Sequence, residues 1–408
     1  MRVVIAPDKF AGTLSAVQAA HAISEGWREA DVAAEPVLSP LSDGGPGFVD
    51  VLAEAARLAG RPARPLTRTV TGPLGAPTEA TVLTVGHPDG DVAYVESAQA
   101  CGLHLVPAEE RDAGRATTYG VGEMIAAAVA DGAHRVVVGL GGSATTDAGA
   151  GMLAALGAVP TLRATSPDAP GSPVSSSAAS AGSGGHAATG AGVAAGLAGG
   201  GAGLPSLAAV DLSAARRAVE GVELVAASDV DNPLCGLNGA ASVFGPQKGA
   251  DRAEVLALDD ALAGFARLVA PDAADMPGAG AAGGLGFGVF VLGGHRTSGI
   301  GAVLDAVGLD AHAAHADLVI TGEGAFDFQS LRGKVPHGVA QVAAGHGVPC
   351  VVLAGRVAVG RREMAAANIT EAYALVDPPG SERAAFDDPY GELVRLAARV
   401  AGRWTRGR

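Results

Sequence analysis

The sequence predicts an α/β protein with two α/β domains, and three observations support this fold class. Short apolar runs rich in valine and isoleucine occur near both ends of the chain, and each leads through a polar loop into a helical pattern. The middle third instead contains extended segments of alternating polarity joined by turns. The composition is 48% hydrophobic but only 4% aromatic. Such a composition is typical of buried parallel strands packed against helices of small residues.

The opening region predicts two successive strand–loop–helix units. Residues 2–6 form a short apolar strand, and the next helix begins at an N-cap provided by Thr13 or Ser15. A second strand runs into the glycine-rich loop 42–47, which the helix 47–59 follows. This alternation of strands and helices predicts a parallel sheet.

The hydrophobic pattern of the sequence changes at about residue 68. We expect a second domain to begin there and to continue to residue 294. Its first segments, 68–85 and 91–98, alternate as antiparallel strands do. Residues 164–203 consist almost entirely of alanine, glycine, serine and proline and contain no aromatic residue. Such a segment cannot bury enough apolar surface to offset its ordering entropy. We therefore expect a flexible insertion without a functional role.

The C-terminal third returns to the strand–loop–helix pattern. Residues 316–324 and 349–355 are apolar strands, and 388–404 form a final helix. The simplest topology joins residues 1–67 and 295–408 in one parallel sheet, with the middle third as a mixed-sheet insert.

Charge and cysteine content exclude several functions. The formal net charge of −14 repels nucleic acids and anionic membrane surfaces, so neither is an expected partner. Cys101, Cys235 and Cys350 are odd in number and far apart, which implies neither a disulfide framework nor a zinc site. No apolar run reaches the ~18 residues that a membrane span needs. The chain opens on a strand rather than a signal peptide, and we expect a cytoplasmic protein.

Five polar loops follow predicted strands. In open α/β sheets, ligands bind at the carboxyl ends of the strands. More acidic and glycine residues gather in these loops than folding alone requires, so they predict a ligand site at one sheet edge. The loops are residues 6–13, 42–47, 141–151, 228–234 and 321–327.

The loop 141–151 has the features of an anion-binding loop. Gly141 and Gly142 allow a backbone to approach a ligand closely. Ser143 and Thr145 offer donors at the start of a helix, which favours a phosphate or a carboxylate. The loop does not have the GxxxxGK[ST] pattern, so it is not a P-loop. A tight turn with an N-cap is the alternative interpretation.

Carboxylates at strand ends can hold Mg²⁺ or accept a proton from a substrate hydroxyl. Asp8, Asp43, Asp229 and Asp231 are the candidates, and each could instead be a turn or cap residue. Asp229 and Asp231 are the candidate metal ligands.

Lysine is scarce, and three lysines lie in loops where they could contact a phosphate. Phosphoryl transfer requires positive charge near the transferring oxygens. Lys9, Lys248 and Lys334 are the candidates, and a solvated surface position is the alternative for each.

Long motifs carry a resemblance to a known family. In chain order they are IAPDKFAGTLSA, SDGG, VTGPLGAP, ATTYGVGEMI, LGGSATTDAGAGML, DVDNPLCGLNGAASVFGPQKGA, PGAGAAGGLGFG and DLVITGEGAFDFQSLRGKVPHGVA. This set resembles the type I glycerate kinase family, from residue 1 to about 375 apart from 164–203. The resemblance implies ATP-dependent phosphorylation of D-glycerate, with 2-phosphoglycerate as the family's usual product. It also implies a cleft between two α/β domains, one of them discontinuous and Rossmann- or flavodoxin-like.

The resemblance and the loop chemistry together define the expected site. ATP and Mg²⁺ are the expected cofactors, and a monomer or homodimer is expected. The candidate catalytic residues are Asp8, Lys9, Asp43, Asp229 and Lys248. The candidate substrate- and phosphate-binding residues are Gly44, Gly45, Gly141, Gly142, Ser143, Thr145, Asp147, Asn232, Glu323, Asp327 and Lys334.

Departures from the family pattern keep two alternatives open. Ala11 stands where the family usually has a lysine, and Ala325 where it commonly has an arginine; Pro46 and Phe48 also depart from the usual loop. The chain could therefore phosphorylate another small hydroxy acid, or be a catalytically silent ligand-binding relative. A Rossmann dehydrogenase is less favoured, because no GxGxxG follows the first strand.

Overall fold

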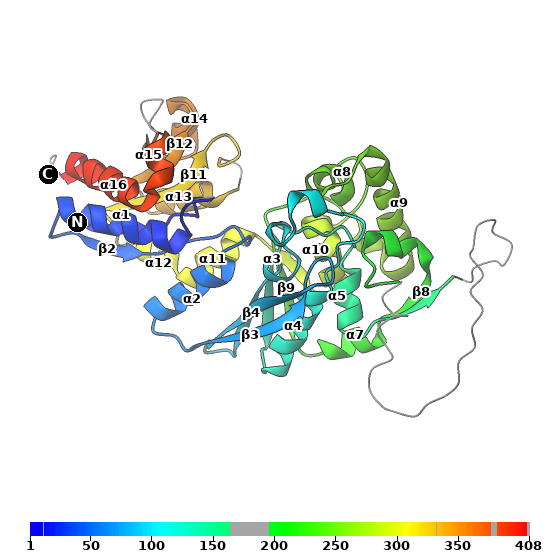
Figure 1. The fold of residues 1–408 in the computed structure, drawn as a ribbon. Coiled ribbons are helices and arrows are strands. Elements are labelled where there is room, and N and C mark those ends of the chain that lie inside the picture. The colour runs from blue at the N-terminus through cyan, green and yellow to red at the C-terminus, as the bar shows by residue number, and fades with distance from the viewer. Residues whose placement is uncertain (11, 164–195, 332, 377–381, 406–408) are drawn as a thin grey trace.

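Two sheets organise the molecule, each in its own lobe (Figure 1). The computed structural model describes the chain except for residues 11, 164–195, 332, 377–381 and 406–408. One sheet is entirely parallel and the other is mixed. The predicted fold class is confirmed.

The first sheet has five strands in the order β13-β12-β11-β1-β2, and the two ends of the chain build it together. All of its pairings are parallel. Its strands are β1 (Arg2–Ile5), β2 (Glu35–Leu38), β11 (Leu318–Phe326), β12 (Cys350–Val357) and β13 (Glu371–Ala374).

Helices cover both faces of this sheet, which explains why its strands are apolar throughout. Val3 and Ile5 face α1 (Ala16–Ala30) and α16 (Pro389–Thr405), which pack against each other. Val4, on the opposite face, belongs to a core that includes α13 (Val335–Gly345). Further short helices of this lobe are α12 (Leu309–Ala313), α14 (Arg361–Ala366) and α15 (Glu382–Asp387).

Helix α1 begins where the sequence predicts. The Ser15 side chain accepts a hydrogen bond from the Gln18 N–H at 3.2 Å, and Gln18 Oε1 accepts one from the Ser15 N–H at 2.9 Å. This reciprocal pair is a capping box, and it satisfies two backbone donors that the first helical turn leaves free.

The second sheet has six strands in the order β10-β9-β6-β5-β4-β3. The pairs β3/β4 and β4/β5 are antiparallel, and the remaining pairs are parallel. Its strands are β3 (Ala63–Thr71), β4 (Pro77–Val85), β5 (Val92–Glu96), β6 (Arg135–Gly139), β9 (Glu223–Ala227) and β10 (His295–Thr297). Its helices are α3 (Ala98–Cys101), α4 (Tyr119–Ala130), α5 (Ala150–Ala155), α7 (Ser213–Ala218), α8 (Ala240–Phe244), α9 (Arg252–Val269) and α10 (Ala281–Val291).

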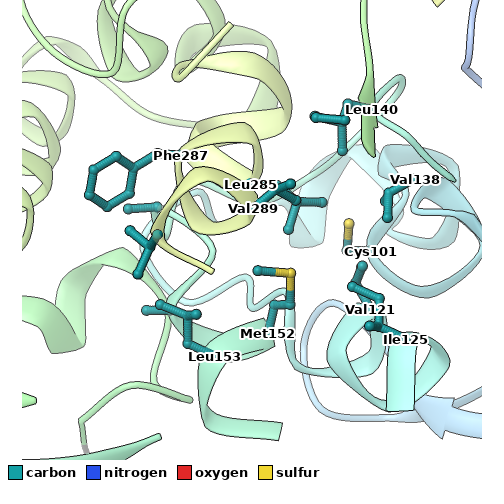
Figure 2. Close-up of a cluster of buried hydrophobic side chains, with 14 of the residues drawn as sticks. Cys101, Val121, Ile125, Val138, Leu140, Met152, Leu153, Leu285, Phe287 and Val289 are labelled. Atoms are coloured by element: carbon teal, nitrogen blue, oxygen red, sulfur yellow. The ribbon is translucent and has the colours of Figure 1, made fainter. Parts of the chain in front are cut away.

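Small residues allow the helices of this lobe to pack closely on one another. Figure 2 shows Met152 of α5 among Leu285 and Val289 of α10 in the core of the lobe. At Gly149 and Gly288 the two backbones approach so closely that a Cβ added at Gly149 would lie 2.9 Å from the Gly288 Cα. The three cysteines of the chain are free, as the sequence predicts.

Two strands differ from the expected domain boundaries at residues 68 and 294. Strand β3 pairs with β4 from residue 63 onward, and β10, at 295–297, pairs with β9. The first residues of β3 are mostly exposed. Because they do not form an apolar run, the hydrophobic pattern of the sequence does not indicate where the strand begins. Strand β10 is only three residues long, too short for a periodic pattern.

Helices α2 (Phe48–Leu58) and α11 (Gly299–Val307) lie between the two lobes (Figure 1). They belong to one core that also includes Val319 of the parallel sheet and Val137 of the mixed sheet. The Phe48 ring packs edge-on against Tyr94 of β5, with 6.0 Å between the ring centroids. The two lobes are therefore joined by a shared apolar layer.

The low-complexity segment emerges from a two-stranded antiparallel sheet formed by β7 (Val159–Leu162) and β8 (Leu207–Asp211). Most of it, residues 164–195, lies outside the described residues. Its last residues do not match the expectation of a flexible insertion, because Leu197 is fully buried in the core of the second lobe. The packed structure resumes before residue 203. Among the described helices, none combines the length and apolarity of a membrane span.

Candidate active site

The end of β1 brings two acidic side chains together. The Asp8 N–H donates to the Gly322 carbonyl at 2.8 Å, which continues the β1/β11 ladder and sets Asp8 opposite Glu323. Both residues are only 7% exposed. Adjacent strands of a parallel sheet thus deliver both carboxylates to the same edge, as the loop pattern predicts.

A cavity of about 600 Å³ lies at this edge of the parallel sheet. One part of its wall is charged and carries both carboxylates and basic groups. Another part is apolar and comes from the ends of β12 and β13 and from α15. The charged residues are Asp8, Lys9, Asp43, Glu323, Asp327, Lys334 and Arg356, and the apolar ones include Phe10, Leu375, Val376, Ala385 and Phe386.

Lys9 and Asp43 form the part of the site nearest the second lobe. Lys9 Nζ lies 3.7 Å from Asp43 Oδ1, and the Gly45 N–H donates to the same oxygen at 3.1 Å. Gly141 of the mixed-sheet lobe packs directly on Gly45, because a Cβ added at Gly141 would lie 2.5 Å from the Gly45 Cα. Only glycine fits such a contact. The two glycine loops therefore meet beside the Lys9–Asp43 pair.

Burial changes the titration of the paired acids. It raises the pKa of Asp8 to about 6, against the opposing effect of Lys9. It raises the pKa of Glu323 to about 7, against the hydrogen bond from Ser330 and the charge of Lys334. Carboxyl groups with such pKa values can exchange protons near neutral pH.

Asp229 caps a helix beside the site. Its carboxylate accepts hydrogen bonds from Ser298 Oγ at 2.6 Å, Gly299 N at 3.0 Å and Ile300 N at 3.1 Å, at the start of α11. Burial raises its pKa despite these donors, and the charge of Asp43 adds to the rise. The charge of Asp229 therefore interacts with that of Asp43 in the site, and both of its carboxylate oxygens accept hydrogen bonds from protein groups.

The predicted metal pair does not fit this geometry. Asp231 is 75% exposed and pairs with Arg296 at 2.6 Å, so it has a different protein partner from Asp229. Within the described part of the chain, no group of three or more histidine, cysteine, aspartate or glutamate residues could hold a metal ion. The two carboxylates are close in sequence but have different partners in the structure. Asp229 accepts from the first N–H groups of α11, and Asp231 pairs with Arg296.

Lys248 is buried inside the second lobe, which contradicts the expectation that it touches the transferred phosphoryl group. It is 2% exposed, and its Nζ donates to the Thr145 carbonyl at 2.6 Å and to Ser143 Oγ at 3.2 Å. Burial lowers its pKa to about 8. Lys248 therefore holds the glycine loop from the inside, and only Gly141 and Gly142 of that loop are accessible.

Two further candidates are structural in this arrangement. Asp147 is fully buried and accepts hydrogen bonds from Thr118 N and Oγ1, both at 2.8 Å, and from Gly149 N at 3.1 Å. The Asn232 side chain donates to the Asn238 carbonyl at 2.7 Å and closes its own loop. Both residues are satisfied by protein groups rather than presented to a ligand.

The sequence did not single out several cavity residues. Arg356 is the last residue but one of β12 and Leu375 directly follows β13, so the strand-end argument could have found them. Phe386 lies on a short helix and has no such signal. Of the departures from the family pattern, Ala325 lines the cavity, whereas Phe48 is fully buried. Ala11 lies outside the described residues.

Comparisons with known proteins show what the whole chain is similar to. The model of the glycerate kinase family matches residues 3–176 and 175–405. Glycerate 2-kinase of Escherichia coli (strain K12) is 38% identical over 98% of this chain and 97% of its own length. Glycerate kinase of Bacillus subtilis (strain 168) is 37% identical over the same shares.

A solved structure extends the likeness to three dimensions. The crystal structure assigned as glycerate kinase 2 from Salmonella typhimurium LT2 superposes with a TM-score of 0.77 at 36% identity, and covers 100% of this chain and 99% of that one. Family match, sequence identity and fold agree along the whole length, and the chain belongs to the glycerate kinase family.

Proposed function

We propose that this protein transfers the γ-phosphoryl group of Mg·ATP to D-glycerate and produces 2-phosphoglycerate and ADP. The observation that carries the proposal is a cavity that combines buried carboxylates with basic side chains in a chain of this family. The name of the Escherichia coli relative, glycerate 2-kinase, supports the choice of product.

The charged part of the cavity suits the phosphates and the glycerate carboxylate. Lys9 follows β1, Lys334 precedes α13 and Arg356 lies near the end of β12, and all three line the same space. Phosphoryl transfer depends on in-line positioning and on positive charge near the transferring oxygens. Asp43 fixes Lys9 through the 3.7 Å ion pair, so the ammonium group is held in place before the substrate arrives.

The apolar part suits the base of the nucleotide. Leu375, Val376 and Phe386 line it, and Phe386 is 70% exposed. Nucleotide pockets use apolar and aromatic walls for contact area and a few polar groups for orientation. We place the adenine against Phe386 and the phosphates toward Lys9 and Lys334.

Mg²⁺ enters this proposal as part of the Mg·ATP substrate. Mg²⁺ keeps several waters and binds through substrate phosphates with few protein oxygens, so its binding does not require a protein cluster. The Asp229–Asp231 pair does not fit the ion, because each carboxylate has its own protein partner. No step in the mechanism is assigned to a protein-bound metal.

A second candidate function rests on Ala325. This residue lines the cavity at a position where the family commonly has an arginine, and the loss of a cation there changes how a substrate carboxylate is held. The same chemistry would then act on another small hydroxy acid.

A coupled assay of ADP release separates the two candidates. The acceptors are D-glycerate, L-glycerate, glycolate and D-lactate, each with Mg·ATP at neutral pH. We expect the highest kcat/KM with D-glycerate. A higher kcat/KM with another acceptor supports the second candidate, and no acceptor-dependent ADP release contradicts both.

A further inference from the structure

Two buried acids, Asp8 and Glu323, face the cavity from adjacent strands. The hydrogen bond from Asp8 N to the Gly322 carbonyl keeps the two strands in register beyond the end of β1. Residues that stand opposite each other in a parallel ladder direct their side chains to the same side of the sheet. Both side chains accordingly line the same cavity.

The protein satisfies these two acids incompletely. The Asp8 carboxylate accepts the N–H of Lys9 at 2.7 Å. Oε1 of Glu323 is buried and has no hydrogen-bond partner among the residues that the structure describes. A buried carboxylate oxygen without a donor is costly, so a proton on Glu323, or a ligand group, must reduce this cost.

The hydrogen bonds favour an ionised Asp8 and a neutral Glu323, because Asp8 accepts the Lys9 N–H while Glu323 Oε1 has no donor among the described residues. Lys9 and Lys334 both lower the pKa of Asp8, which Asp43 raises. Lys334 also lowers the pKa of Glu323, which the charges of Asp8 and Asp327 raise. Burial outweighs these charges and raises the pKa of Asp8 to about 6 and the pKa of Glu323 to about 7.

We propose that Asp8 and Glu323 work as one proton-sharing pair, in which Asp8 is the general base for the acceptor hydroxyl and the protonated Glu323 positions and tunes it. This inference rests on the proposed function and extends it, because it assigns the base and a positioning residue. Two carboxyl groups at one site cannot both ionise easily, and they titrate as a pair.

The transfer step balances with no further reactant. The acceptor oxygen forms a bond to the γ-phosphorus, and the bond from that phosphorus to the β,γ-bridging oxygen breaks. ADP keeps the electron pair of the broken bond. The proton of the hydroxyl group passes to Asp8, and it returns to solvent after the product leaves.

The first test is the pH dependence of kcat for the full chain with D-glycerate and Mg·ATP. Asp8→Asn should lower kcat by about 10²–10⁴-fold, the usual contribution of a general base. Glu323→Gln keeps a neutral donor, so it should retain kcat within about threefold and keep the acidic limb that Asp8 sets. It should lose the decline above about pH 7 that ionised Glu323 causes. Glu323→Leu removes the donor and should lose more activity than Glu323→Gln.

Asp305→Asn is the matched control. Asp305 lines a different cavity, beside the amino ends of the strands of the mixed sheet, and this variant should keep the wild-type profile. The inference is overturned when Asp8→Asn retains wild-type kcat, or when kcat of Glu323→Gln declines above about pH 7 as that of the wild type does.

The second test needs no turnover. A carboxyl whose pKa is raised in the folded state loses its stabilising effect as pH rises from the unfolded to the folded pKa, here from 4.5 to about 7. Glu323→Gln removes that loss, so its melting temperature should rise relative to wild type between about pH 5 and 8. A difference that stays constant over this range contradicts the shared proton. Wild-type protein without kinase activity would overturn the proposed function alone, because this second test measures the titration of Glu323 without turnover.

Discussion

At the scale of single residues, burial decides which polar side chains of the loops can act. Asp8 and Glu323 are buried but border the cavity, whereas Asp147 is enclosed by backbone donors. The sequence predicts all three as site residues, Asp8 as catalytic and Asp147 and Glu323 as substrate- or phosphate-binding. Their difference depends on packing from distant segments, such as Thr118 with Asp147, and no local pattern encodes it.

Lys9 provides a test of the charge at the site. Lys9→Met should lower kcat by about 10²–10³-fold, the scale for the loss of one preorganised donor. Its melting temperature should change little, because a partly exposed ion pair contributes about 0–1 kcal/mol to stability. Steady-state kinetics and thermal melting of the same preparation check both parts. A large drop in melting temperature with intact kcat would reassign Lys9 to the fold.

Lys248 should show a mixed effect. Lys248→Met leaves the Thr145 carbonyl and Ser143 without their buried donor, which should cost about 1–3 kcal/mol in the free energy of unfolding. The kcat/KM should fall as well, because the loop that carries Gly141 loses its support. Denaturant titration and kinetics measure the two effects. Unchanged stability with a large loss of kcat would favour direct contact with the substrate.

At the scale of elements, strand ends and helix starts position the site. Sequence periodicity predicts the strands of the parallel sheet, and the rule for parallel sheets predicts that their loops converge. The two-lobe contact could not be predicted, because it depends on the backbones of two glycine loops. The role of Asp229 could not be predicted either. It caps α11 through contacts with Ser298 and the residues that follow it, which are about 70 positions away in the sequence.

The glycine contact predicts a steric effect. Gly141→Ala places a Cβ 2.5 Å from the Gly45 Cα, so the two loops must separate, and kcat/KM should fall by about tenfold or more since small displacements of a site are costly. Gly402→Ala is the control. No atom lies within 4 Å of its added Cβ, and this helical position should be neutral or slightly more stable. Equal kinetics for the two variants would contradict the contact.

The α11 cap predicts an effect on stability. Asp229→Ala should lower the free energy of unfolding by about 0.5–2 kcal/mol, the range for the loss of an N-cap side chain. Asp229→Asn keeps an oxygen that can accept at the same distance from the backbone and should recover part of that loss. Chemical denaturation of the pair gives the answer. If both variants keep wild-type stability and lose activity, then Asp229 serves the reaction rather than the helix.

At the scale of the whole molecule, two lobes share an apolar layer, and the cavity belongs mainly to the parallel sheet. Family resemblance predicts two α/β domains, and the two sheets confirm this fold class. The start of β3 and the whole of β10 lie outside the range 68–294 that was expected for the second domain. The position of the low-complexity segment was clear from composition. Its end was not, because Leu197 is a single apolar residue among alanines and glycines, and its burial depends on the surrounding lobe.

Paired deletions test where the packed structure resumes. Removal of residues 168–192 should leave the melting temperature and kcat close to wild type, because the segment lacks core-forming side chains. Removal of residues 168–203 also deletes Leu197 and should destabilise the protein by about 2–5 kcal/mol, the cost of losing a buried leucine side chain. Equal melting temperatures for the two deletions would show that residues 196–203 are dispensable.

The central claim is that the cavity around Asp8 performs phosphoryl transfer from Mg·ATP to D-glycerate. The most direct measurement is a ³¹P NMR spectrum of the complete reaction, recorded for the wild type and for Asp8→Asn. We expect the wild type to form 2-phosphoglycerate and ADP in equal amounts, and folded Asp8→Asn to form almost none of either. ADP and inorganic phosphate without a phosphoglycerate signal, or equal product from both proteins, would contradict this account.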